Sequence, residues 1–294
     1  SKNQPREAVT ALQATLARRR PDAIISALSS VGSAIVPIAE REGILTIVTT
    51  TALSGLPTGT QNVVRVYPTT EDFVEPVARH MAEHYRRVAV LYVHDDFGES
   101  NKDEFVRIVR DAGVTVTAAE PFALTQADSR TLVERVLSEG PEAVFVTGYG
   151  PAFIGIFRHL REANRDLPVY SEIGFANPVV LDALGADADG IVFDGTPLEL
   201  GQSNVQAVES FRSAYADRHD RPPYQVAGFC HDSLLAIAAA ASRNDGRTPG
   251  KAEVVALSPF EGAMGPIQFD SDGDSRIALR LMVRRAGRTE LLTE

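Results

Sequence analysis

Short, continuously apolar segments alternate along this chain with longer segments in which apolar residues recur at three- and four-residue spacing. The short segments are typical of strands buried on both faces of a sheet, and the longer ones of amphipathic helices. Val74, Val77, Ala78 and Met81, for example, predict one face of a helix. The alternation predicts an α/β fold with parallel sheets. The predicted strands are residues 23–28, 44–49, 88–92, 143–147, 167–172 and 191–194.

The two ends of the sequence depart from this alternation. Pro5 suits the first turn of a helix, so the sequence opens on a helix. A crossover helix normally follows a strand, which favours a missing upstream piece. Near the other end, Leu279, Leu281 and Val283 alternate with mainly basic positions, and residues 285–288 supply a turn. This pattern predicts antiparallel or edge pairing.

Composition narrows the class of protein. With 294 residues and 44% hydrophobic residues, the chain has enough apolar material for about two domains. A net charge of −10 repels phosphate backbones, so nucleic acid is not an expected partner. The single cysteine, Cys230, excludes an intramolecular disulfide and a cysteine-rich zinc site. No stretch reaches the length of a transmembrane helix, and no secretion signal is recognisable at the start.

Small hydroxyl residues follow two of the predicted strands. Ser29 and Ser30 precede a helix expected to begin near Gly32, and Thr50 and Thr51 follow the next strand. Helix N-termini favour anions, and open α/β sheets expose ligand clefts at the carboxyl ends of their strands. The chemistry therefore suits a carboxylate, although an ordinary N-cap and a polar turn explain the same residues.

Two motifs indicate metals but lack complete ligand sets. His80, Glu83 and His84 match the H-x-x-E-H pattern of zinc peptidases, yet the only well-spaced helical carboxylate that could complete the site is Glu162. The alternative is a polar helix edge. Residues 270–274 resemble a calcium loop, but the glycine and the twelfth position do not fit one, and we reject that interpretation.

Residues 22–56, 88–98 and 143–172, and the ending F-x-G-x-x-G-x-x-x-F-D-x-x-G-D at 260–274, resemble bacterial solute-binding proteins of the branched-chain amino acid type. These proteins are receptors of ABC importers. The resemblance implies a type I periplasmic-binding fold, in which two Rossmann-like parallel-sheet lobes are joined by a three-segment hinge. It places residues 1–68 and 197–275 in lobe 1, and residues 69–196 and 276–294 in lobe 2. The first βαβ piece of lobe 1 is expected to be missing.

The resemblance also implies the roles of several residues in an inter-lobe cleft. Ser29 and Ser30 would hold the α-carboxylate of the ligand. Thr50 and Thr51 would contact its carboxylate and amino groups, whereas Ala52 stands where the family commonly has threonine. Glu172 matches the acidic residue that pairs with the ligand ammonium.

Aromatic residues complete the site that the resemblance implies. Phe97 stands where relatives often carry tyrosine, and Tyr149 lies in another loop bordering the cleft. Phe229 falls near a further contact segment, at the start of a helix expected over residues 229–241. Asp232 is expected to be a helix-start carboxylate. Such aromatics wall off a ligand side chain, although each also suits ordinary packing.

The implied function is therefore a monomeric, periplasmic, non-enzymatic receptor that needs no cofactor or metal. It would capture an amino acid or a related small carboxylate by hinge closure and present it to an ABC permease in the inner membrane. The same fold also serves as the ligand-sensing domain of regulators and receptors, and that alternative stays open. A zinc metallopeptidase at His80, Glu83 and His84 is a more distant alternative.

Overall fold

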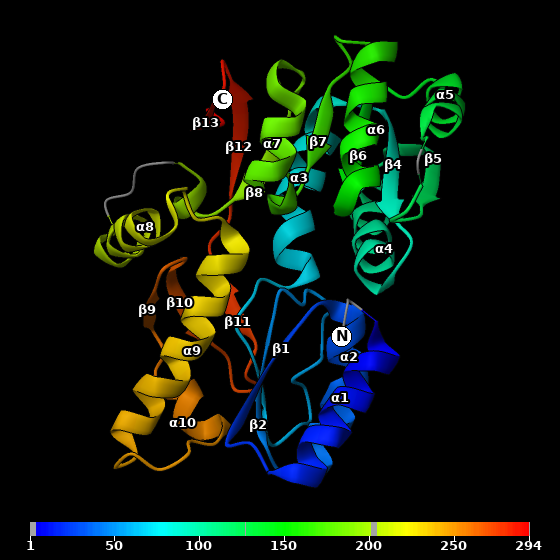
Figure 1. Cartoon of the computed structure of the whole chain (residues 1–294). Coiled ribbons are helices and arrows are strands. Elements are labelled where there is room, and N and C mark those ends of the chain that lie inside the picture. The colour runs from blue at the N-terminus through cyan, green and yellow to red at the C-terminus, as the bar shows by residue number, and fades with distance from the viewer. Residues whose placement is uncertain (1–3, 127, 201–204, 294) are drawn as a thin grey trace. The chain divides into compact units, whose positions relative to one another are not determined.

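The computed structural model describes residues 4–126, 128–200 and 205–293. The chain divides into two compact units, each made of two stretches of sequence. Unit 1 comprises Ser1–Thr69 and Ser203–Ala278, and unit 2 comprises Thr70–Gln202 and Leu279–Glu294. Figure 1 shows the helices and strands of each unit.

Unit 2 is built on a seven-stranded sheet of order β13-β12-β8-β7-β6-β4-β5 (Figure 1). Strands β4 to β8 pair in parallel, whereas β12 is antiparallel to β8 and forms a hairpin with β13. This hairpin confirms the antiparallel pairing predicted near the end of the sequence. The strands are β4 (Arg87–Val93), β5 (Thr115–Phe122), β6 (Ala143–Thr147), β7 (Val169–Ser171), β8 (Val192–Gly195), β12 (Arg280–Arg285) and β13 (Arg288–Leu291).

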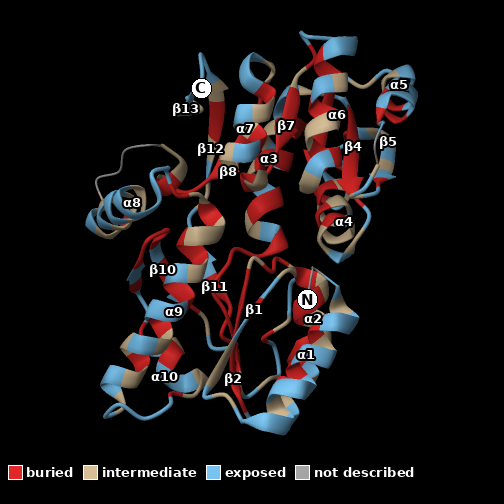
Figure 2. Cartoon of the chain, in the orientation of Figure 1, coloured by how far each residue is buried: buried red, intermediate tan, exposed pale blue. Residues whose placement is uncertain are grey.

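Helices cover both faces of this sheet, and alternate residues of β6 pack against the helices on opposite faces. Val144 and Val146 join the apolar cluster formed with α5, α6 and α7. Phe145 instead stacks on Phe105 of α4, with ring centroids 4.7 Å apart. The central strands are consequently buried along almost their whole length (Figure 2). The helices are α3 (Thr70–His84), α4 (Asp96–Asp111), α5 (Arg130–Ser138), α6 (Gly150–Ala163) and α7 (Pro178–Leu184), with short 3-10 turns η1 (Ile173–Ala176), η2 (Gly185–Ala188) and η3 (Pro197–Leu200).

Unit 1 contains two three-stranded sheets. The parallel sheet has the order β1-β2-β3, and the antiparallel sheet has the order β11-β10-β9. The parallel strands are β1 (Ala23–Ala27), β2 (Leu45–Thr49) and β3 (Val63–Arg65). The antiparallel strands are β9 (Phe260–Gly262), β10 (Gly265–Phe269) and β11 (Ser275–Ile277).

The helices of unit 1 include a closely packed pair near the start of the sequence. Leu12 of α1 and Val31 and Ile35 of α2 belong to one buried cluster. Pro5 occupies the first turn of α1, as predicted. The helices are α1 (Pro5–Arg18), α2 (Ser29–Arg41), α8 (Gln206–His219), α9 (Gln225–Arg243) and α10 (Lys251–Val255).

The α/β class and the six predicted strands are confirmed, with ends displaced by up to two residues. The pattern missed β3, which is short and ends on an arginine, and β5, which is partly exposed along its length. It also missed the strands of the antiparallel sheet. Within the described residues, no helix is both long enough and apolar enough to cross a membrane.

Candidate functional site

The carboxyl ends of β1 and β2 are linked through two residues with unusual backbone conformations. Leu28 has a φ of 75° and Thr50 a φ of 45°. The Leu28 amide donates to the Thr50 carbonyl oxygen at 3.1 Å and lies 3.3 Å from Thr50 Oγ1. Positive φ is costly for a residue with a side chain, above all a β-branched one, and such strain gathers at functional positions. The two loops predicted to hold a carboxylate are thus fixed to each other in a strained form.

Ser29 and Ser30 form the first turn of α2, whose N-cap is Leu28. The expectation that the helix begins near Gly32 is therefore wrong, and these serines are not N-caps. Ser29 is buried, and its Oγ has no hydrogen-bond partner among the described residues. First-turn amides lack intrahelical partners and carry the positive end of the helix dipole. A carboxylate placed here would meet both amide and hydroxyl donors.

The loop after β2 is held from within unit 1 by the fully buried Arg65. Arg65 Nη1 donates to the Thr51 carbonyl oxygen at 2.6 Å, and Nη2 donates to the Leu53 carbonyl oxygen at 2.7 Å. Thr51 and Ala52 are buried, and Thr51 Oγ1 donates to the Thr49 carbonyl oxygen at 2.9 Å. Thr50 is the more exposed of the two predicted threonines.

The end of the F-D-x-x-G-D motif forms a turn that presents Asp274 to Arg65. Asp270 Oδ1 accepts the amides of Asp272 and Asp274, each at 2.9 Å. Gly273 has a φ of 78°, and its carbonyl oxygen accepts the Arg65 amide at 2.8 Å. The motif is therefore a structural turn in unit 1 rather than a calcium loop.

The earlier glycine of the same motif accommodates a buried carboxylate. Asp232 of α9 accepts the amide of Ala263 at 2.7 Å and that of Met264 at 3.0 Å. A Cβ on Gly262 would lie 2.3 Å from Asp232 Oδ2. Because α9 begins at Gln225, Asp232 is not a helix-start carboxylate, and that expectation is wrong. It anchors the β9–β10 turn instead.

Phe229 is fully buried in α9 of unit 1. Its ring meets that of Tyr67 edge to face, with centroids 4.7 Å apart and an interplanar angle of 71°. This contact explains Phe229 as a packing residue, and a ligand contact at this position stays a prediction.

Glu172 directly follows β7 in unit 2 and is 1% exposed. Its Oε2 accepts the Gly174 amide at 2.5 Å, and its Oε1 accepts the Gly148 amide at 3.4 Å. Burial raises the pKa of Glu172 to about 7, against the opposing effect of these two amides. An ammonium group beside this carboxylate would favour its ionised form.

A second buried acid, which the sequence reasoning missed, lies in the neighbouring strand β8, one residue before its end. Asp194 is fully buried, and neither carboxyl oxygen hydrogen-bonds to a described residue. The pKa of Asp194 is raised well above its ordinary value, first by burial and then by the charge of Glu172. The available signal was positional, since both predicted strands end on an acidic residue.

Phe97 and Tyr149 are brought together in unit 2, with ring centroids 6.2 Å apart. Both pack at the edge of the apolar core. The Tyr149 hydroxyl donates to Asp95, the N-cap of α4, whose other carboxylate oxygen accepts the Gly98 amide at 3.0 Å. Burial and Asp95 raise the pKa of Tyr149. Asp95 therefore positions one of the predicted aromatics.

The H-x-x-E-H residues lie on α3, where the two histidines contact each other. The rings of His80 and His84 stack with centroids 4.2 Å apart, and His80 Nδ1 lies 3.1 Å from the Tyr170 hydroxyl. Burial, followed by the charge of His84, lowers the pKa of His80. Among the residues the structure describes, no three or more His, Cys, Asp or Glu side chains are grouped to hold a metal ion. The zinc hypothesis thus gains no further ligand.

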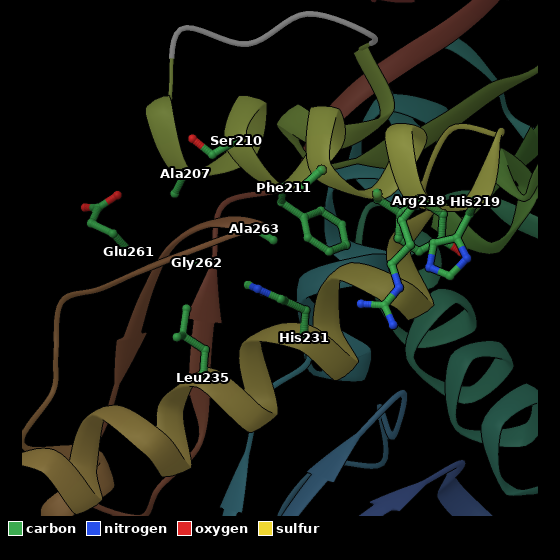
Figure 3. A pocket seen from close by; sticks show the side chains of 12 residues that line it. Ala207, Ser210, Phe211, Arg218, His219, His231, Leu235, Glu261, Gly262 and Ala263 are labelled. Atoms are coloured by element: carbon green, nitrogen blue, oxygen red, sulfur yellow. The ribbon is translucent and has the colours of Figure 1, made fainter.

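An open groove of about 680 Å³ lies in unit 1 between α8, α9 and the β9–β10 turn (Figure 3). Phe211 and His231 both line it, and their rings contact each other with centroids 4.8 Å apart. His231 Nδ1 lies 3.0 Å from Asp232 Oδ1. None of the predicted site residues lines this groove.

Sequence comparison shows similarity along nearly the whole chain. A family model described as "Periplasmic binding protein" matches residues 1–287. The Leu/Ile/Val/Thr/Ala-binding protein of Pseudomonas aeruginosa is 24% identical over 204 residues, which cover 68% of this chain and 54% of that protein. The Leu/Ile/Val-binding protein of Citrobacter freundii is 24% identical over 247 residues, covering 81% of this chain and 64% of that protein. The matches thus span between half and two thirds of these relatives.

Solved structures show the same fold. A leucine-binding protein from Thermotoga maritima has a TM-score of 0.89 at 20% identity, covering 99% of this chain and 84% of that chain. A solute-binding protein from Rhodopseudomonas palustris, solved in complex with benzoate, has a TM-score of 0.89 at 18% identity, covering 98% and 81%. At these identities the similarity establishes the type I periplasmic-binding fold.

Proposed function

Because the chain belongs to the periplasmic binding protein family, we propose that it is an extracytoplasmic, non-enzymatic solute-binding protein of an ABC importer. Its ligand would be an amino acid or a related small carboxylate. The names of similar proteins state that they bind leucine, isoleucine and valine, and one structural neighbour was solved in complex with benzoate. The partner would be a permease in the inner membrane.

The observation that carries this proposal is the buried carboxylate of Glu172. It accepts hydrogen bonds from two backbone amides, but no cation is among the groups that chiefly determine its pKa. A buried acid without a cation is costly, and an ammonium group removes that cost. The ligand ammonium would therefore supply the positive charge that is not among the main influences on Glu172 in the described part of unit 2.

The opposite end of the ligand would use the first turn of α2 in unit 1. The amides there and the unpartnered Ser29 Oγ are donors suited to a carboxylate. Thr50, fixed by its contact with Leu28, adds a hydroxyl at the neighbouring loop. We take the two units as the two lobes, so that a zwitterion contacting both would favour the closed form over the open one.

A thermal-shift assay on protein freed of carried-over ligand tests this function. The panel would contain the twenty proteinogenic L-amino acids together with benzoate and 4-methylpentanoate as carboxylates without an amine. A ligand at one hundred times its Kd adds about 2.7 kcal/mol to the free energy of unfolding, which a melting curve resolves. A selective shift supports the proposal, and the absence of any shift across the panel contradicts it.

A further inference from the structure

Glu172 and Asp194 are neighbours because of strand register. Strands β7 and β8 are parallel, and their last registered pair is Ser171 with Phe193. Glu172 directly follows β7, and Asp194 is the next residue within β8, so continuing this register by one residue places their side chains on the same face of the sheet. The negative charge of Glu172 also acts on Asp194.

The two acids differ in how their oxygens are satisfied. Glu172 accepts hydrogen bonds from the backbone amides of Gly174 and Gly148. Both oxygens of Asp194 are buried and make no hydrogen bond with any described residue, Glu172 included. The amides of Ile173 and of Asp194 itself favour its ionised form electrostatically but do not reach hydrogen-bond geometry. Both oxygens of Asp194 can therefore still accept a hydrogen bond from a well-placed donor.

The charges around Asp194 do not compensate for its burial. Glu172 and Glu199 both act on it as negative charges. No lysine, arginine or histidine is among the main influences on Asp194 or Glu172 within the described part of the chain. An ionised, unpaired carboxylate in such a place is unfavourable, so it must hold a proton or receive a cation.

The geometry points to a ligand-specificity role for Asp194: together with Glu172 it forms a two-carboxylate subsite that receives a primary ammonium group. This inference rests on the proposed function and narrows its ligand class. A primary ammonium has three N–H donors and can bridge two carboxyls that do not hydrogen-bond to each other. A carboxylate without an amine would leave both acids uncompensated, so the subsite selects amino acids over simple aromatic or aliphatic acids.

Binding at such a subsite exchanges protons for the ligand cation. In the unliganded protein, burial keeps protons on the pair near neutral pH. An arriving ammonium favours the ionised carboxylates, and the displaced protons pass to the buffer. This release distinguishes a ligand-binding pair from acids that are simply buried in protonated form.

Isothermal titration of wild-type protein, Asp194→Asn and Asp166→Asn would test the inference. The probes are the twenty proteinogenic L-amino acids, with benzoate and 4-methylpentanoate as amine-free carboxylates. Asp166 is exposed and serves as the matched control. We expect wild type to bind at least one amino acid and neither amine-free acid. Asp194→Asn should weaken that binding by about tenfold or more, whereas Asp166→Asn should leave it within about twofold.

Two further readouts separate a binding role from a structural one. Titration of wild type at pH 6 in buffers of different ionisation enthalpy should show proton release, and Asp194→Asn should release fewer protons. Unliganded Asp194→Asn should also melt at least as high as wild type at pH 8, because the buried carboxylate is gone.

Unchanged amino-acid affinity in Asp194→Asn, or no proton release by wild type, overturns the inference and leaves the proposed function standing. Binding of only the amine-free acids also overturns it while preserving a solute-binding role. Absence of binding to every probe contradicts the proposed function itself, and the inference falls with it. If Asp194→Asn does not fold, the wild-type protein still tests the inference through its proton release and through its preference for amino acids over the amine-free acids.

Discussion

Arg65 Nε lies 2.6 Å from Asp274 Oδ1, and this ion pair joins two residues that are far apart in the sequence. The Arg65 side chain is fully buried and also binds the carbonyl oxygens of Thr51 and Leu53. One guanidinium thus connects the end of the F-D-x-x-G-D turn to the loop predicted to contact the ligand. Both belong to unit 1, so the position of this loop is fixed by contacts within that unit.

Replacing Asp274 should be strongly destabilising. Asp274→Asn leaves the Arg65 charge buried without its partner, and breaking one side of a buried pair costs about 3–5 kcal/mol. Urea unfolding would measure the loss. Asp272→Asn is the control, because Asp272 is exposed in the same turn. Equal stability of the two variants would show that the ion pair contributes little.

The stability of the unliganded protein should fall as pH rises from about 4.5 to 7. The pKa of Glu172 is about 7 in the folded protein, against an ordinary value of 4.5, so the folded state binds more protons in this range. The loss attributable to Glu172 is roughly 3 kcal/mol. Asp194 acts in the same direction.

Glu172→Gln should remove the Glu172 share of this pH dependence. Urea midpoints of wild type and Glu172→Gln at pH 5 and pH 7.5 would measure it. The residual slope should come from Asp194, whose pKa is raised first by burial. Parallel profiles of the two proteins would refute the raised pKa.

Gly262 should not tolerate even one added methyl group. A Cβ there would lie 2.3 Å from Asp232 Oδ2, and the carboxylate is fixed by the amides of Ala263 and Met264. We expect Gly262→Ala to cost about 1–3 kcal/mol. Gly155→Ala is the control: its Cβ would meet Ser129 Oγ at 3.6 Å in the middle of α6, so it should be neutral or stabilising by up to about 1 kcal/mol. Melting temperatures of both variants would decide.

Among the residues predicted to bind ligand, Glu172 should matter more than the Tyr149 hydroxyl. Glu172→Gln removes the charge opposite the ligand ammonium and should weaken amino-acid binding by about tenfold or more. Tyr149→Phe removes a hydrogen bond to Asp95 but keeps the aromatic wall, so affinity should change by only about twofold. Titration with the best amino acid of the twenty would compare them. Small and equal effects of the two substitutions would contradict the proposal that Glu172 binds the ligand ammonium.

The sequence alone predicted the features that depend on local pattern. Continuously apolar runs identified the strands buried on both faces, because a central parallel strand must be apolar on both sides. Alternation near residue 280 predicted the antiparallel hairpin for the complementary reason. The pattern did not predict strand β5, because β5 is partly exposed. It did not predict β3, because an arginine in the sequence normally indicates a surface position, whereas the arginine of β3 is buried. The helix at Ser29 was placed too late, because no side chain caps it and Leu28 adopts positive φ instead.

Only the tertiary structure decided which distant residues meet. Sequence placed Glu172 and the hydroxyls of Ser29 and Thr50 at strand ends, but not the partners that hold them. Arg65 reaches Asp274, and Asp194 lies beside Glu172, because strand order and register bring separate segments together. Hydrophobic periodicity encodes which side of an element is buried, whereas the order of strands arises from packing of the whole unit. The buried charges of this protein are therefore set by contacts that no local pattern contains.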